Sequence, residues 1–147
     1  MLRESLNKWL KIDPIQIINE ILSDRVILNW IAERNREQLQ KGLNSQDVKL
    51  SDIGGGYSDR TLQLRPEKVR DRVNLFDTGE FYKSIMAKAN VNLVEINADP
   101  IKEDEFGNQT NLFNEWGKDI IGLNDENLQE LIEMVKNKLI IEILKKV

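Results

Sequence analysis

The residue with the clearest potential for acid–base chemistry is Asp77, which follows Leu75 and Phe76 and precedes Thr78 and Gly79. If two copies of the chain placed this carboxyl group at a shared axis, the pair could hold one proton between them and activate a water molecule. Most other catalytic machinery is excluded, because the chain contains no histidine and no cysteine. The commonest general base near neutral pH and every thiolate nucleophile or ligand are therefore absent.

Two further clusters carry weaker chemical signals. Residues 54–56 are three glycines, but no Gly-Lys-Ser/Thr follows them, so we interpret them as a flexible turn rather than a phosphate-binding loop. Acidic residues gather at Asp99, Glu103, Asp104 and Glu105, where oxygen ligands could hold a hard cation. Their spacing lacks the alternation and the glycine of a calcium-binding loop, so we expect a solvated acidic turn, with no metal and no cofactor.

The composition is that of an ordinary folded protein. The 147 residues suffice for one hydrophobic core, and 40% of them are hydrophobic against 31% charged, so we expect a single domain. The net charge of −4 gives no overall attraction to nucleic acid or anionic lipid. No apolar run approaches the roughly 18 residues of a membrane span, and the first residues lack a signal-peptide pattern. We therefore expect a cytoplasmic protein with no membrane partner.

Residues 1–42 are predicted to be helical. Apolar residues recur at helical spacing at Leu2, Leu6, Trp9 and Leu10. A second helical stretch is predicted to begin after Asp13, a good N-cap, and to continue to Lys41, with a division at residues 23–24 and Gly42 as the C-terminal cap. We interpret these helices as packed on their own domain; an arm that docks on a neighbour is the alternative.

Residues 43–72 lack a clear period and are predicted to form an extended loop with a short strand at residues 61–64. Loops of this length in a small domain are usually functional or become ordered on binding. The segment has five basic residues that could contact DNA nonspecifically: Arg60, Arg65, Lys68, Arg70 and Arg72. They are set against Asp59, Glu67 and Asp71, so the excess of positive charge over residues 59–72 is only two.

Residues 73–147 are predicted to form an α+β core. A helix is expected to begin at a cap provided by Asp77 or Thr78, with an apolar face made by Phe81, Tyr82, Ile85 and Met86. A strand is expected over residues 91–98, because β-branched and apolar residues alternate there between turn-forming residues. Residues 102–108 are expected to form a polar turn.

The C-terminal part is predicted to be helical. Residues 111–116 favour a helical turn that ends at Gly117. The last helix is expected to begin after Asn124, with acidic residues at its positive end and lysines at its negative end. Its apolar stripe consists of Leu128, Leu131, Ile132, Val135, Leu139 and Ile143. We expect this stripe to pack in the core rather than to line a cofactor site.

Residues 75–79 resemble the active-site signature of retroviral-type aspartic proteases, and residues 120–122 resemble the apolar-apolar-Gly segment found later in those enzymes. This resemblance implies a dimeric protease that uses Asp77. Those proteases usually have Ala or Ser after the glycine and short strands around the motif, whereas Glu80 begins a helical pattern here. The protease is therefore kept as an alternative hypothesis.

Residues 75–85 also resemble the segment Leu-x-x-Thr/Ser-Gly-x-Leu-x-x-Ser-Ile of tail-completion and head–tail joining proteins of tailed bacteriophages, the virion morphogenesis group. In that family a strand, an aromatic-Gly pair and a Gly-Leu before the last helix follow, and residues 91–98, 116–117 and 122–125 resemble these parts in order. The family often has Pro-Ala-Arg before its Gly-Leu, which residues 118–121 lack. The resemblance is carried by Asp77, Thr78, Gly79, Phe81, Tyr82, Ser84, Ile85, Trp116, Gly117, Gly122 and Leu123.

This resemblance implies a fold in which long N-terminal helices and a C-terminal amphipathic helix pack on a small antiparallel sheet. It also implies a structural subunit with no enzymatic activity, present in the virion as a homo-oligomeric ring at the neck or upper tail. The expected partners are other phage neck, portal or tail proteins, and the five basic residues would be able to contact packaged DNA. Assembly would take place in the cytoplasm of the host bacterium.

The motif would then have a structural role. Asp77 would cap the helix with support from Thr78, Gly79 would allow close backbone approach, and Phe81, Tyr82 and Ile85 would fix the helix to the sheet. Because a ring needs two different contact faces on each subunit, the N-terminal helices and residues 43–72 are the candidate faces. A cytoplasmic adaptor unrelated to phages is the third hypothesis.

Overall fold

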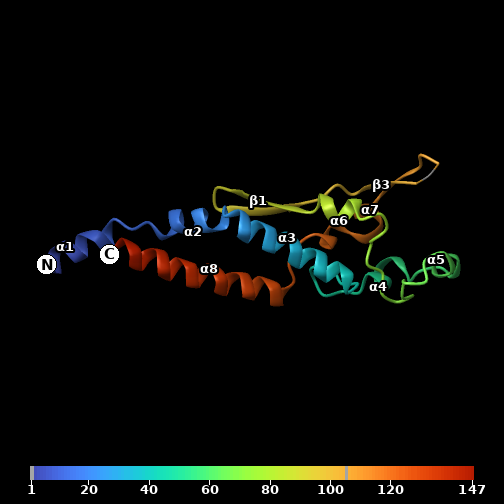
Figure 1. Cartoon of the computed structure of the whole chain (residues 1–147), viewed down its shortest axis with the longest axis horizontal. Coiled ribbons are helices and arrows are strands. Elements are labelled where there is room, and N and C mark those ends of the chain that lie inside the picture. Colours follow the sequence, from blue (N-terminus) through green and yellow to red (C-terminus); the bar gives the residue numbers. More distant parts are fainter. Residues whose placement is uncertain (1, 105) are drawn as a thin grey trace.

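The chain has an elongated α+β fold, as predicted. The computed structural model describes residues 2–104 and 106–147, and it contains helices together with two small antiparallel sheets. Figure 1 shows a body at one end of the long axis and a stalk that carries both termini at the other. Within the described residues, no helix is both long and apolar enough to cross a membrane.

The N-terminal residues form three helices, α1 (Leu2–Leu10), α2 (Pro14–Leu22) and α3 (Arg25–Gln40). The predicted starts are confirmed, because side-chain oxygens satisfy free backbone N–H groups there. Asp13 Oδ1 accepts hydrogen bonds from the first turn of α2, including one of 3.1 Å from Ile15 N. Asp24 Oδ1 accepts from Val26 N at 2.7 Å, which divides α2 from α3 where the sequence indicated.

Residues 43–72 contain two short helices, α4 (Leu50–Gly54) and α5 (Asp59–Leu64). The predicted strand at residues 61–64 is wrong. Ser58 caps α5, with its Oγ accepting a hydrogen bond of 3.2 Å from Thr61 N, so the local chain closes into a helical turn. Leu50 is completely buried and fixes this segment to the core.

Helix α6 (Glu80–Ser84) is shorter than predicted, and strand β1 (Met86–Asn90) follows it. The expectation that Met86 shares the apolar face of that helix is therefore wrong. β1 pairs antiparallel with β2 (Leu93–Asn97), and Met86 lies opposite Asn97 with its side chain exposed. The predicted strand over residues 91–98 is confirmed in its central part, since the hairpin turn occupies its first residues.

The segment that follows is a second hairpin, of β3 (Ile101–Glu103) and β4 (Gln109–Asn111), where only a polar turn was predicted. It leads into α7 (Leu112–Trp116) and the short 3-10 helix η1 (Lys118–Ile120). The predicted helical turn is confirmed: Asn111 Oδ1 caps α7 by accepting from Phe113 N at 2.9 Å, and Gly117 follows its last residue.

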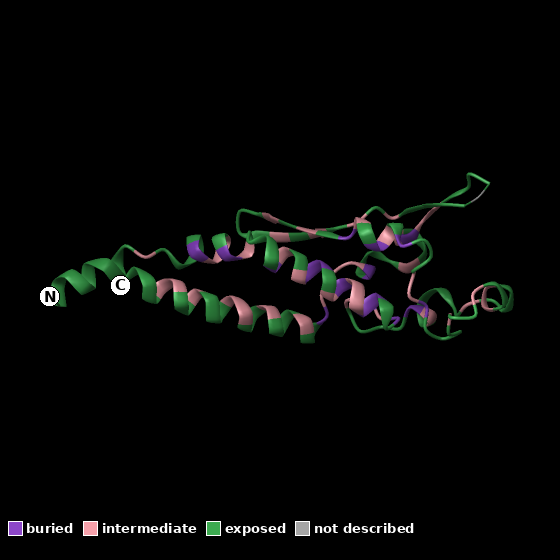
Figure 2. Ribbon diagram, in the orientation of Figure 1, coloured by how far each residue is buried: buried purple, intermediate pink, exposed green. Residues whose placement is uncertain are grey.

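The last helix, α8 (Asp125–Lys146), begins at the predicted cap, with Asn124 Oδ1 accepting from Asn127 N at 2.9 Å. The expectation that its apolar stripe is a core element is wrong, because none of the described residues of α8 is buried (Figure 2). Leu128 and Ile132 are 42% and 47% exposed. α8 contacts α2. Because the stalk is thin, the contacts within it cover only one side of α8.

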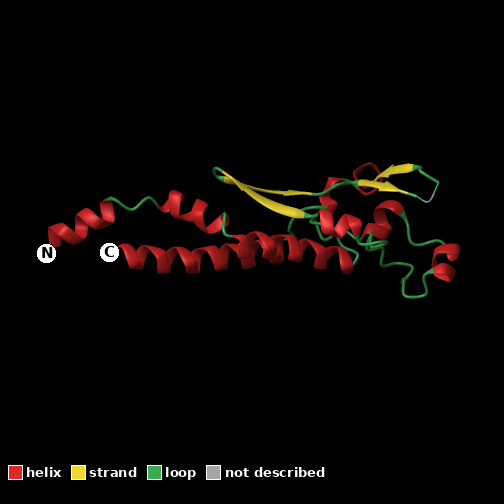
Figure 3. Cartoon of the chain, turned by 45° about the horizontal axis from the view of Figure 1, so that its top comes forward, coloured by secondary structure: helices red, strands yellow, loops and turns green. Residues whose placement is uncertain are grey.

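The stalk has three layers. α8 lies on one side of α2 and α3, and the β1–β2 hairpin lies on the other (Figures 1 and 3). The hairpin is fastened to α2 by paired amides, with Asn19 Nδ2 donating to Asn92 Oδ1 at 2.9 Å and Asn92 N donating to Asn19 Oδ1 at 3.1 Å. The inner layer is made of the buried residues Ile17, Ile21, Ile27 and Ile31.

The core of the body gathers residues that are distant in sequence. Buried side chains from α3, α4, α6, α7, η1 and the segments beside α6 form one cluster of Ala32, Leu39, Leu50, Val73, Tyr82, Ile85, Leu112 and Ile120. Burial of this apolar surface is the main stabilising contribution to the body.

A pair of buried amides on α3 holds the segment that leads into α8. Asn35 Nδ2 donates to Ile120 O at 3.0 Å, and Asn35 Oδ1 accepts from Gly122 N at 2.9 Å. One turn further on, Gln38 Nε2 donates to Gly122 O at 2.8 Å and Gln38 Oε1 accepts from Asn124 N at 2.8 Å. Asn35 is 0% and Gln38 4% exposed, so these amides replace water for an irregular piece of backbone.

We expect Asn35→Ala to lower the free energy of unfolding by about 3 kcal/mol, because it leaves a buried carbonyl and a buried N–H group without partners. Urea unfolding followed by circular dichroism measures this change. The control is Asn29→Ala, an exposed asparagine of the same helix, which should change stability by less than about 0.5 kcal/mol. Equal effects of the two substitutions would contradict the role of Asn35.

Candidate functional site

Residues 75–85, called the motif below, form a bent segment that leads into α6. Gly79 is the N-cap residue in a left-handed conformation, φ +86°, and a Cβ atom there would lie 3.2 Å from the ring of Phe76. The expectation that Asp77 caps the helix is wrong; α6 has no side-chain cap at Gly79. Thr78 gives the only local support, with its Oγ1 accepting from Glu80 N at 3.4 Å in the described structure. The positive φ at the bend favours glycine, whereas the role predicted for Gly79 was close backbone approach.

Asp77 instead joins two distant segments through ion pairs. Its carboxylate lies 3.0 Å from Lys102 Nζ on β3 and 2.9 Å from Arg65 Nη1 after α5. The hydrogen bond from Lys102, followed by that from Arg65, lowers the pKa of Asp77 below its ordinary value of 3.8. The carboxylate is thus ionised near neutral pH and ties residues 43–72 to the second hairpin.

Tyr82 is the centre of the motif. It is 5% exposed, its hydroxyl donates to Asn74 O at 2.5 Å, and the edge of its ring meets Phe76 at a centroid distance of 5.1 Å. Burial raises the pKa of Tyr82, so the hydroxyl remains a hydrogen-bond donor. The predicted packing role of Tyr82 agrees with these contacts, and Asn74 is a partner that the sequence did not indicate.

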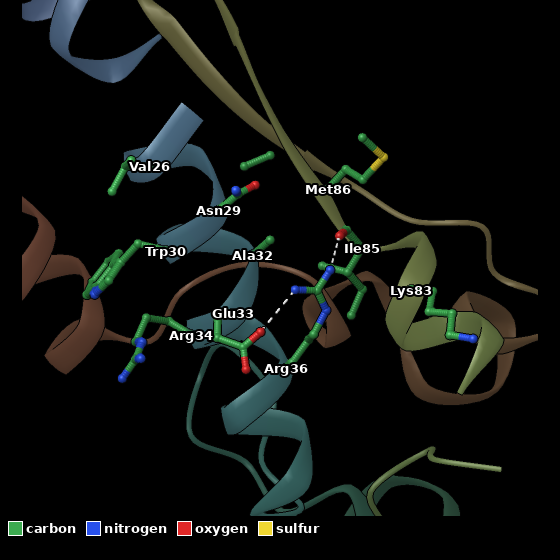
Figure 4. A pocket seen from close by; sticks show the side chains of 11 residues that line it. Val26, Asn29, Trp30, Ala32, Glu33, Arg34, Arg36, Lys83, Ile85 and Met86 are labelled. Atoms are coloured by element: carbon green, nitrogen blue, oxygen red, sulfur yellow. Dashed lines mark hydrogen bonds and ion pairs between the residues drawn. The ribbon is translucent and has the colours of Figure 1, made fainter. Parts of the chain in front are cut away.

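Arg36 connects α3 to the end of the motif. Its guanidinium donates to Tyr82 O at 2.9 Å and to Ile85 O at 2.8 Å, and it pairs with Glu33 at 3.1 Å. Figure 4 shows this guanidinium between Glu33 and Ile85, beside a pocket that α3 forms with the start of β1. These contacts satisfy the last carbonyl groups of α6 and hold Ile85, which is completely buried.

Ser84 joins α6 to the loop after β2. Its Oγ donates to Phe81 O at 2.6 Å and accepts from Asp99 N at 3.0 Å. The half-buried ring of Phe81 packs against the core of the body. Ser84 therefore fastens α6 to the loop at the end of the first hairpin, and Phe81 fastens it to the core.

The C-terminal motif positions lie elsewhere in the body. The ring of Trp116 covers Gly54, where a Cβ atom would be only 2.6 Å from the indole. Gly117 and Gly122 both have positive φ values, +83° and +125°, and Leu123 is half-buried beside the amides of α3. All these positions shape the backbone or fill the core, and they form no set of side chains that converges on a substrate.

Three of the five basic residues proposed to face DNA are engaged within the chain. Arg65 pairs with Glu67 as well as Asp77, and Lys68 Nζ donates to Asn74 Oδ1 at 2.8 Å. Arg70 donates to Tyr57 O at 3.0 Å and to the carboxylate of Asp59. The side chains of Arg60 and Arg72 are exposed. Most of these five positive charges are therefore engaged in contacts within the chain, both inside residues 43–72 and with residues 74–77.

The motif borders a groove of about 800 Å³ between α5, residues 73–78, the second hairpin and α7. The residues that line it include Phe76 and Trp116 as well as Glu103 and Glu115. Among the described side chains, no group of three or more potential metal ligands is suitably placed; Glu105 of the acidic cluster lies outside the described residues. Asp104 instead orders its own turn by accepting from Asn108 N at 2.8 Å.

No protein-family model, curated protein or solved structure matches the chain.

We expect Asp77→Asn to lower the free energy of unfolding by about 0.5–1 kcal/mol near neutral pH, since the two ion pairs are partly exposed to solvent. The lowered pKa means that this contribution is present above pH 3.8 and is lost as the pH falls below that value. The difference between wild type and variant, measured by urea unfolding between about pH 7 and about pH 3, should therefore shrink at acidic pH. A difference that grows on acidification would contradict the ion pairs; Asp52→Asn, an exposed aspartate on α4, is the control.

Proposed function

We propose that the chain is a structural subunit of a tailed-phage virion, a neck, head–tail connector or tail-completion ring component that acts by protein–protein assembly. One observation carries the proposal: large apolar side chains remain exposed along the whole stalk. Exposed apolar surface of this extent usually marks a protein interaction site. The most exposed large apolar side chains of α1 and α8 are Leu2, Leu6, Trp9, Leu10, Ile140, Ile141 and Leu144.

The placement of the motif residues supports the same proposal. Tyr82 and Ile85 are buried, Gly79 forms a bend, and Asp77 and Ser84 fasten neighbouring segments. Residues that stabilise a fold in this way are expected in a subunit whose function depends on its shape and surfaces. They give no arrangement of nucleophile, base and oxyanion donors that would favour an enzyme.

The geometry at Asp77 disfavours the protease alternative. A shared-proton dyad requires two close carboxylates, one of which is protonated. Lys102 and Arg65 hold Asp77 ionised, and a second copy would have to displace both cations before its own carboxylate could approach. The residues after Asp77 also form the helix α6, whereas the protease dyad requires a closed, β-rich dimer around the motif.

We expect the purified chain to form concentration-dependent oligomers, because burying the exposed stalk residues is favourable. Mass photometry at nanomolar and light scattering at micromolar concentration measure this, and electron microscopy distinguishes closed rings from open chains. Adding the purified chain to neck or tail components of disrupted virions tests whether the chain joins them. A ring would also separate this proposal from that of a cytoplasmic adaptor, whereas a persistent monomer that joins no virion component would contradict it.

We expect Asp77→Asn to assemble as the wild type does, and neither protein to cleave peptides. An unstructured peptide library followed by mass spectrometry measures cleavage at the protein concentration at which oligomers form. Cleavage by the wild type that is absent from a folded Asp77→Asn variant would favour the protease instead.

A further inference from the structure

Helix α1 exposes an apolar stripe that its own chain leaves uncovered. Leu2, Leu6, Trp9 and Leu10 are between 50% and 87% exposed, and none of the nine described residues of α1 is buried. Their spacing places all four on one face of the helix. An amphipathic helix of this length is marginal in water unless that face is covered. The stripe therefore requires a partner surface.

The groove beside the motif has matching chemistry. Its apolar surface includes Leu64, Phe76 and Trp116, and Leu64 is 69% exposed although it lines the groove. The volume of about 800 Å³ lies in the range of about 300–1,000 Å³ that is usual for binding sites. Amphipathic helices commonly bind by placing residues i, i+3 or i+4, and i+7 or i+8 into an apolar groove of this kind.

The charges of the two surfaces are complementary. Lys102 and Arg65, which line the groove, are already paired with Asp77. Three acidic groove residues, Glu103, Asp104 and Glu115, have no ion pair within residues 2–104 and 106–147. α1 and the residue that follows it provide Arg3, Lys8 and Lys11 against a single Glu4. Among the described residues, Lys68 also lines the groove without an ion pair, so three unpaired carboxylates face one unpaired ammonium group there. A basic helix thus meets a groove whose net charge is negative.

The two surfaces lie at opposite ends of the molecule, so the contact has to be between copies. Figures 1 and 3 place α1 at the free end of the stalk, whereas α5, α7 and the second hairpin lie at the far end of the body. Only residues 11–13 connect α1 to α2, and three residues span at most about 11 Å. α1 cannot reach the groove of its own chain without unfolding the stalk.

We propose that α1 of one copy binds in the groove of a second copy, with Leu6, Trp9 and Leu10 on Leu64, Phe76 and Trp116 of the second copy. This inference rests on the proposed assembly function and names the contact by which the assembly forms. The interface is heterologous, because each copy uses one surface as donor and a different one as acceptor. Such contacts close into a ring when the rotation per subunit completes a full turn and otherwise extend into a filament.

The first test compares substitutions that add one carboxylate to each surface with matched controls. Leu6→Asp on α1 and Leu64→Asp in the groove should each weaken self-association by about 100-fold, because a charge would be buried in the contact. Asn7→Asp, off the stripe of α1, and Val91→Asp, exposed on the turn of the first hairpin, should leave it unchanged. Circular dichroism and urea unfolding should show a wild-type fold for all four variants, since the substituted side chains are exposed.

The second test mixes the two defective variants. Leu6→Asp keeps an intact groove and Leu64→Asp keeps an intact α1, so a 1:1 mixture should form heterodimers that cannot extend further. Mass photometry of the mixture, with one variant carrying a fusion tag that separates the masses, measures this. Rescue of pairing by mixing is expected only for a heterologous contact.

The outcomes distinguish this inference from the assembly proposal. If the wild type forms oligomers but Leu6→Asp or Leu64→Asp does not weaken them, or if the mixture fails to pair, the groove contact is wrong while assembly stands. Loss of oligomers in Leu6→Asp alone would indicate a contact between stalk ends. If the wild type remains monomeric at every concentration and joins no virion component, both proposals are overturned.

Discussion

The contacts of Asn35 and Gln38 with the backbone of residues 120–124 determine how the two ends of the chain meet. These amides are buried, and the carbonyl and N–H groups that they satisfy belong to no helix ladder or sheet. Loss of either amide would leave polar backbone unpaired in the core. Because the segment leads directly into α8, its anchoring decides the direction in which that helix leaves the body. The start of α8 is thus held against α3 by two buried polar side chains, and its contact with α2 continues the stalk.

Sequence patterns predicted those elements that local contacts determine. Asp13, Asp24 and Asn124 each cap a helix by binding backbone N–H groups within three residues, so their effects are visible in the sequence. β1 was missed because Ala and Lys have little strand preference, and this strand forms because β2 pairs with it and α3 packs on it. The α8 stripe was misinterpreted for a related reason: periodicity indicates which residues share a face but not whether a partner covers that face.

The same distinction applies to the candidate site. Gly79 at a bend and the buried Tyr82 both lie in the segment for which a structural role was predicted. The partners of Asp77 are 12 and 25 residues distant, at Arg65 and Lys102, and no local pattern indicates them. Its position before a helix predicted a cap, but two ion pairs with distant residues hold its carboxylate elsewhere. Ion pairs with distant residues therefore override the preference of an aspartate for the N-terminal end of a helix.

The distribution of charge along the molecule favours assembly between unlike ends. The free end of the stalk, residues 2–12 and 133–147, has seven basic and three acidic residues, a net charge of +4. Residues 99–126, which form the second hairpin, α7, η1 and the start of α8, have eight acidic and two basic residues, a net charge of −6. Two stalk ends repel each other, whereas a stalk end and a distant body attract. In the proposed contact, the apolar residues would supply the free energy and the charges would select which surfaces meet. Because the two surfaces are different and far apart on one chain, an open assembly built by this contact would keep one unused surface of each kind, one at either end, until it closes.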